Sequence, residues 1–136
     1  MHTQTLSLSQ LVKLDLQHNE LKQIPHCLLE LPSLSELNLS HNQLQEIPDI
    51  PEWSASLTVL DLSYNCLVSL PLSVVAPSLH KLSIAYNQFH EVPKCVCSFT
   101  TLQELDLSGN SDIHSVPPEI DSLPHLVQLK PPTESK

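Results

Sequence analysis

The sequence predicts an α/β solenoid, a coil of repeated turns with short parallel strands on one face and turns, 3₁₀ pieces or short helices on the other. A leucine pattern recurs every 22 to 24 residues along most of the 136-residue chain. Within each unit, leucines alternate with polar residues, which is typical of a short strand with one buried face. One asparagine and one proline also recur in each unit. Proline has no backbone N–H, so it fits a return segment outside the sheet.

Each unit reads Leu-x-x-Leu-x-Leu-x-x-Asn-x-Leu-x-x-Ile-Pro, with first leucines at Leu11, Leu34, Leu57, Leu79 and Leu102. This pattern resembles the leucine-rich repeat, which implies a horseshoe-shaped solenoid with its strands on the concave face. The five predicted repeats span residues 11–33, 34–56, 57–78, 79–101 and 102–125. We expect residues 1–10 to be the tail of a preceding repeat, and residues 126–136 to be a truncated sixth repeat with a polar tail.

The second repeat shows which side chains should form the interior. Its apolar residues at the repeat positions are Leu34, Leu37, Leu39, Leu44 and Ile47. We expect the next repeat to cover them, and each buried leucine contributes about 1.5–3 kcal/mol to folding. Because no repeat can bury this face alone, stability depends on stacking between neighbours.

An asparagine column marks the place where the chain turns off each strand. An asparagine side chain offers both donors and an acceptor, so a buried one can bridge adjacent turns of the coil. The predicted structural ladder consists of Asn19, Asn42, Asn65, Asn87 and Asn110.

The return segment of the second repeat departs from the pattern. It reads Pro-Asp-Ile-Pro-Glu-Trp (48–53) and so contains an extra proline and the only tryptophan of the chain, Trp53, three residues after Ile50. Two interpretations are open. Either both side chains fill the back of the coil in place of leucines, or Trp53 is a landmark on the convex surface for a partner.

The exposed strand positions form columns along the concave face that are candidates for partner binding. One column carries rings and a second carries carboxylates, and tyrosine is common at the energetic centres of interfaces. The alternative is that both columns are ordinary repeat consensus and merely solvated. The candidate residues on the concave face are His18, His41, Tyr64, Tyr86, Asp15, Asp61 and Asp106.

Composition limits the partners. Six Lys and Arg stand against fifteen Asp and Glu, so the formal net charge is −9. A nucleic acid backbone or an anionic membrane surface would be repelled. We therefore expect protein partners or other domains of a parent protein, with no nucleic acid and no membrane insertion. The four cysteines do not form the clustered caps of secreted repeat proteins, which favours reduced thiols in the cytoplasm.

Catalysis and cofactor binding lack their usual signals. The single glycine, Gly109, excludes a glycine-rich phosphate loop. Cys95 and Cys97 follow His90 closely, but this spacing lacks the paired ligands of a structural zinc site. We expect no catalytic residues, no metal and no cofactor in this chain.

Several segments are similar to one particular family beyond the generic repeat. These are Leu-Asp-Leu-Gln-His-Asn (14–19), Pro-Glu-Trp (51–53), Leu-Asp-Leu-Ser-Tyr-Asn (60–65) and Leu-Asp-Leu-Ser-Gly-Asn-Ser-Asp-Ile (105–113). Together they resemble the leucine-rich repeat kinases of the ROCO family. The resemblance implies a fragment of a cytoplasmic GTP-binding serine/threonine kinase, in which this segment is a regulatory interaction or scaffold module. The alternative is a structural spacer or autoinhibitory shield that contacts only the parent's own domains.

Overall fold

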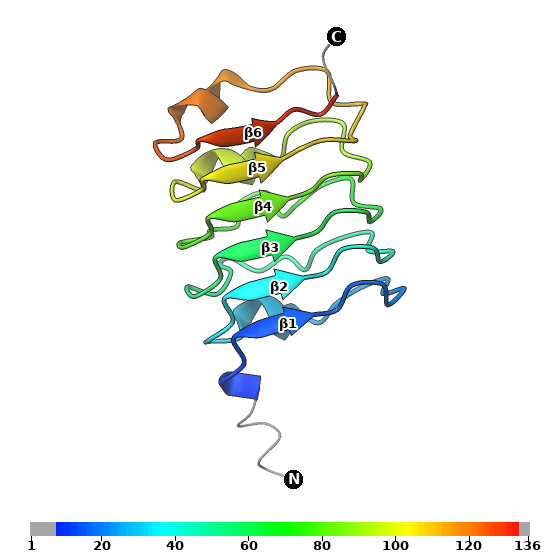
Figure 1. The fold of residues 1–136 in the computed structure, drawn as a ribbon, viewed down its shortest axis with the longest axis vertical. Helices are drawn as coiled ribbons and strands as arrows, with labels where there is room; N and C mark the ends of the chain where they lie inside the picture. The colour runs from blue at the N-terminus through cyan, green and yellow to red at the C-terminus, as the bar shows by residue number, and fades with distance from the viewer. Residues whose placement is uncertain (1–7, 134–136) are drawn as a thin grey trace.

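The computed structural model describes residues 8–133, which build one open parallel sheet in chain order (Figure 1). Its six strands stack along the long axis of the molecule, from β1 to β6. The strands are β1 (Lys13–Asp15), β2 (Glu36–Asn38), β3 (Val59–Asp61), β4 (Lys81–Ser83), β5 (Glu104–Asp106) and β6 (Gln128–Lys130). One strand lies in each predicted repeat, which confirms the leucine-rich-repeat solenoid.

The register of the sheet places equivalent repeat positions side by side. The central residue of each strand pairs with the central leucine of the next, as Leu37 does with Leu60. In the inner strands this central leucine is buried, and its two neighbours face outward and are only partly buried or exposed. The repeat pattern therefore turns into columns of like positions along the sheet.

The core lies between the sheet and the return segments. The second-repeat residues predicted to point inward are all buried, and Leu34, Leu39 and Leu44 have no measurable exposure. The same holds for equivalent leucines of the following repeats, such as Leu57 and Leu79. Stacked layers of leucine form the interior, as the composition predicts.

The return segments differ from one repeat to the next. Three of them contain a 3₁₀ helix that begins directly after the repeat proline: η1 (His26–Glu30), η2 (Lys94–Ser98) and η3 (Pro118–Ser122). The return segments of the second and third repeats contain no helix and meet through a parallel bridge between Glu52 and Val75.

Trp53 fills the back of the coil. Its side chain is 1% exposed, and its ring centroid lies 5.6 Å from that of Phe99 at a tilt of 50°. Ile50 is also buried. The hypothesis that Trp53 is a convex-surface landmark is therefore wrong, because the wide indole is needed to fill the interior where the second and third return segments carry no helix.

The structure tests the predictions for the two ends of the repeat array to different extents. The expected tail of a preceding repeat falls mostly outside the described residues, so it stays a prediction. At the other end, the truncated sixth repeat contributes β6, which pairs with β5. Within residues 8–133, no helix has the length and apolar character needed to cross a bilayer.

Candidate binding surface on the concave face

The four predicted ring residues form one continuous stack. Ring centroids are 4.3 Å apart between His18 and His41, 4.3 Å between His41 and Tyr64, and 4.5 Å between Tyr64 and Tyr86. Interplanar angles are 17°, 10° and 7° in the same order. All four side chains are exposed. We call these four residues the ring ladder.

The ring ladder lies in the turns that follow the strands, and not in the strands themselves. Each strand ends three residues before its ring residue, as β3 does at Asp61 before Tyr64. The prediction of exposed strand positions is wrong for this column. The physical reason is the backbone: the four residues have φ between 56° and 62°, in the left-handed region that cannot continue a strand.

Backbone hydrogen bonds between neighbouring turns bring the rings into contact. The N–H of His41 donates to the carbonyl of Ser63 at 3.0 Å, and the N–H of Tyr64 donates to the carbonyl of Ala85 at 2.9 Å. These bonds continue the spacing of the sheet, about 4.8 Å between strands, past the strand ends. Equivalent side chains then have the separation at which aromatic rings stack.

Gly109 occupies the fifth position of the same column. Its φ of 76° is also left-handed, and a Cβ at this position would overlap the ring of Tyr86. The Tyr86 ring therefore lies directly over the backbone of the next turn. Glycine is required here both for its backbone conformation and for its missing side chain.

The asparagine column holds the turns that carry the ring ladder. Asn65 accepts a hydrogen bond on Oδ1 from the Leu44 N–H at 2.9 Å, and its Nδ2 donates to the carbonyls of Leu39 at 3.0 Å and Leu62 at 3.1 Å. Two of these partners belong to the preceding repeat. Asn42, Asn87 and Asn110 make the equivalent bonds across adjacent turns. Each left-handed turn is thus fixed by its own asparagine.

The carboxylate column has a local role as well as an outward face. Oδ1 of Asp61 accepts from the Ser63 N–H at 3.0 Å and from the Ser63 hydroxyl at 2.6 Å. Asp106 makes the same two bonds to Ser108, and Asp15 accepts from the Gln17 N–H at 3.1 Å. One oxygen of each carboxylate therefore shapes the turn. The second oxygen of Asp15 accepts from Nε2 of Gln17 at 3.0 Å, and that of Asp106 lies 3.9 Å from Nζ of Lys130, so only Asp61 keeps an oxygen without a partner within residues 8–133.

Lysines on the concave face are paired across strands. The Nζ–carboxylate distances are 3.7 Å for Lys13 with Glu36 and 3.6 Å for Lys81 with Glu104. Lys130 lies 3.9 Å from Oδ2 of Asp106. Because these pairs are solvent-exposed, each contributes little to stability. They do neutralise every lysine on this face.

Lys130 and Gln128 belong to the surface but were missed by sequence reasoning. The sixth repeat was treated as truncated, so its strand residues were left out of the columns. Leu126 and Leu129 match the leucines at the first and fourth positions of the repeat, and this match was the signal that could have placed Gln128 and Lys130.

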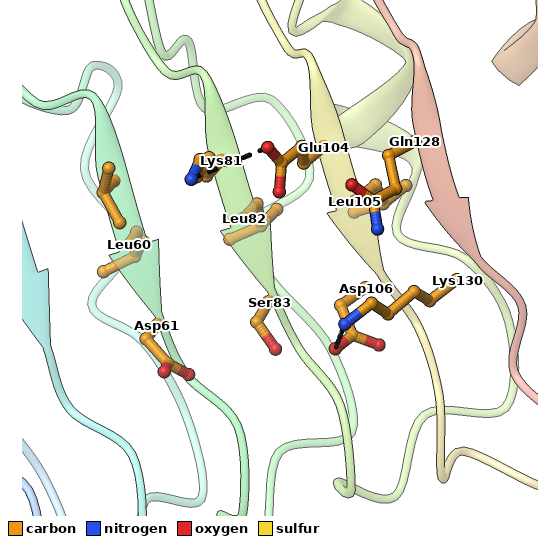
Figure 2. A pocket seen from close by; sticks show the side chains of 11 residues that line it. Leu60, Asp61, Lys81, Leu82, Ser83, Glu104, Leu105, Asp106, Gln128 and Lys130 are labelled. Atoms are coloured by element: carbon orange, nitrogen blue, oxygen red, sulfur yellow. Dashed lines mark ion pairs between the residues drawn. The ribbon is translucent and has the colours of Figure 1, made fainter.

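Two shallow hollows occupy the concave face. One, of about 190 Å³, lies over β3 to β6, and Figure 2 shows Asp61, Lys81, Glu104, Asp106 and Lys130 around it. The other, of about 340 Å³, lies over β1 to β3. Val59 and Asp61 line both hollows. The centre of the concave face is therefore a small apolar and acidic spot on β3.

The cysteines and His90 do not assemble into a reactive group within residues 8–133. Burial raises the pKa of the Cys95 thiol to about 11. Burial, followed by the nearby charge of Glu119, raises the pKa of Cys97. High pKa values keep both thiols protonated, which disfavours nucleophilic attack and metal ligation. His90 lies 3.6 Å from a carboxylate oxygen of Asp112.

Comparisons with known proteins identify the repeats. Two family models, both described as leucine-rich repeat, match residues 2–44 and residues 56–76 and 101–123, together more than half of the chain. A search of curated protein sequences gives no match. Leucine-rich repeats generally mediate protein–protein interaction and are typically non-catalytic modules.

Among 23 matching solved chains is a leucine-rich-repeat protein of Leptospira interrogans. It is 24% identical over 93% of this chain, with a TM-score of 0.57. The present chain spans 44% of the length of that protein. With the repeat models and the parallel-strand solenoid, these findings show that the chain belongs to the leucine-rich-repeat family.

Proposed function

We propose that this chain binds a protein partner through its concave face, with the ring ladder at the centre of the contact. The observation that supports the proposal is the stack of four exposed rings, with centroids 4.3 to 4.5 Å apart. Tyr64 is 44% exposed and Tyr86 is 49% exposed. Rings held by their neighbours lose little conformational freedom on binding, so the ladder is a preorganised surface.

The ladder would present its edges to a partner. Both faces of the Tyr64 ring are covered by neighbouring rings, which leaves the ring edge and the polar tip of the side chain exposed. Asp15, Asp61 and Asp106 run beside it, and Asp61 supplies a carboxylate oxygen with no partner within residues 8–133. A rigid aromatic wall next to acceptors combines contact area with polar specificity.

Partner capture with matched variants tests this proposal. The immobilised chain is compared with a Tyr64→Ala, Tyr86→Ala double variant and with a Leu72→Ala, Val75→Ala control. The control residues are 71% and 51% exposed and lie in the third return segment. We expect partners to be lost from the ring-ladder variant and kept by the control. If every partner binds the ring-ladder variant unchanged, the ladder is not the site.

We further propose that the chain is the regulatory leucine-rich-repeat region of a larger cytoplasmic GTP-binding serine/threonine kinase. The support is the resemblance of residues 51–53 and 105–113 to ROCO-family kinases; the family models match the repeats alone. A phosphate-binding loop encoded next to this segment is the expected finding, and its absence from the parent protein would remove the assignment.

The alternative role within such a parent is a spacer or autoinhibitory shield. In that case the concave face would contact only the parent's own domains. Binding of the isolated repeats to those domains in trans, with no external partner captured, would favour the shield over the scaffold.

A further inference from the structure

We infer that the concave face accepts an extended basic segment of the partner protein, with a basic residue at every third position and its anchor at Asp61. This inference rests on the proposed protein-binding function and specifies the chemistry of the partner. It depends on the charge balance of the face, on the hollows that meet on β3, and on the spacing of the carboxylates.

The charge balance leaves negative charge without a counter-ion. The outward positions of the strands carry five carboxylates, on Asp15, Glu36, Asp61, Glu104 and Asp106, and three lysines. All three lysines are already paired with Glu36, Glu104 and Asp106. Among the described residues, Asp15 and Asp61 have no cationic partner. A segment with Lys or Arg would neutralise them, whereas an acidic one would be repelled.

Asp61 is the best placed of the two. Its Oδ1 is occupied by Ser63, and its Oδ2 has no hydrogen-bond or ion-pair partner within residues 8–133. Val59, two residues earlier on β3, is the only aliphatic residue at its column position and lines both hollows. An apolar surface beside a free carboxylate oxygen matches a lysine or arginine side chain, which has an alkyl stem and a charged head.

The spacing of the carboxylates defines the register of the partner. The two carboxylates without a cationic partner, Asp15 and Asp61, lie on β1 and β3 and are therefore two strands apart, about 10 Å. A polyproline II helix has three residues per turn and rises about 3.1 Å per residue. Every third residue then lies on one face at intervals of about 9 Å. This match favours an extended segment that runs along the solenoid axis.

The peptide (Lys-Pro-Pro)₃ is a suitable probe, because it adopts the required conformation and carries the required charges. Its binding to the full chain is followed by fluorescence anisotropy at low salt, where exposed charges are least screened. Asp61→Asn removes the charge and should keep the turn, because Asn38 already makes both equivalent bonds to Ser40, at 3.0 Å and 2.7 Å. Asp49→Asn is the matched control, since Asp49 is exposed on a return segment.

We expect Asp61→Asn to weaken peptide binding about fivefold to tenfold, and Asp49→Asn to change it by less than about twofold. Equal losses in the two variants would mean that the peptide senses only net charge, and would overturn the inference. So would equal binding of (Glu-Pro-Pro)₃. Either result leaves the proposed protein-binding role intact, because partner capture by the ring-ladder variant tests that role separately.

Discussion

The two sides of the solenoid follow different rules. On the strand side, the second to fifth repeats share the same contacts: a three-residue strand, an acceptor at its end, a left-handed residue and an asparagine that bridges to the preceding repeat. On the return side, three repeats form 3₁₀ helices, and the two that lack a helix are joined by a bridge. The conformation of the strand side is set by hydrogen bonds, and the conformation of the return side is set by the interior volume that its side chains must fill.

This difference has a direct consequence for function. Identical backbone geometry in each turn places unlike side chains at a fixed spacing, so the strand side can display an ordered row of groups. The ring ladder is such a row. The return side has no common spacing, and three of its exposed apolar residues, Val68, Leu72 and Val75, come from the third repeat.

Replacing Trp53 tests the claim that the return side is specified by volume. Trp53→Ala should lower the free energy of unfolding by about 3–5 kcal/mol, because it leaves a large cavity. Trp53→Phe should cost less than about 1.5 kcal/mol, since Nε1 of Trp53 has no hydrogen-bond partner within the described residues and most of the volume is kept. Urea unfolding measures both. Equal losses would show that the indole itself is specified.

Replacing Asn65 tests the opposite claim for the strand side. Asn65→Ala should cost about 1–3 kcal/mol, because it leaves the buried N–H of Leu44 without an acceptor and removes one of the two side-chain donors to the Leu39 carbonyl. Asn19→Ala is the control: Asn19 is exposed, and within residues 8–133 its Nδ2 donates only to carbonyls of its own turn. We expect the control to lose less than about 1 kcal/mol in the same unfolding experiment. A loss at Asn65 no larger than at Asn19 would contradict the bridging role.

The strand side was the predictable part of the sequence, for a physical reason. The leucine alternation reports burial on one face of a strand, and the recurring asparagine reports a turn whose backbone groups need a partner. Both signals come from requirements that are the same in every repeat. The strands of the five complete repeats, the buried leucines and the solenoid therefore followed from the sequence.

The other features of the structure depend on side-chain packing and backbone conformation, which the repeat pattern does not specify. The sequence left two readings for Trp53, because the filling of the return side depends on the shapes of neighbouring segments. It identified the column of His18, His41, Tyr64 and Tyr86 but placed it in the strands, since nothing in the pattern shows that bulky residues adopt positive φ. Lys130 was not placed on the concave face, because the repeat pattern breaks off within the sixth repeat and its strand was not included in the columns.

Gly109 offers a test of how closely the ring ladder is tied to the strand-side backbone. Gly109→Ala should cost about 1–2 kcal/mol, because a left-handed φ is unfavourable for alanine, and the new Cβ also displaces the Tyr86 ring. Combining it with Tyr86→Ala removes the overlap and leaves only the backbone cost. A double-mutant cycle of unfolding free energies separates the two. If Gly109→Ala costs the same in both backgrounds, the Tyr86 ring does not lie over the glycine.

The smallest effect concerns the return side, where cysteine reactivity reports packing without changing stability. Cys27 is exposed on η1, Cys97 is half-buried on η2, and Cys95 is buried on the same helix. With its pKa raised from 9.0 to about 11, Cys95 holds a smaller thiolate fraction than an ordinary cysteine at every pH below about 11. Alkylation by iodoacetamide at pH 8 should therefore be fastest at Cys27 and slowest at Cys95, as followed by mass spectrometry. In denaturant the three rates should converge. Rapid labelling of Cys95 in the folded chain would mean that η2 opens easily, and that the irregular return side is loosely packed as well as variable.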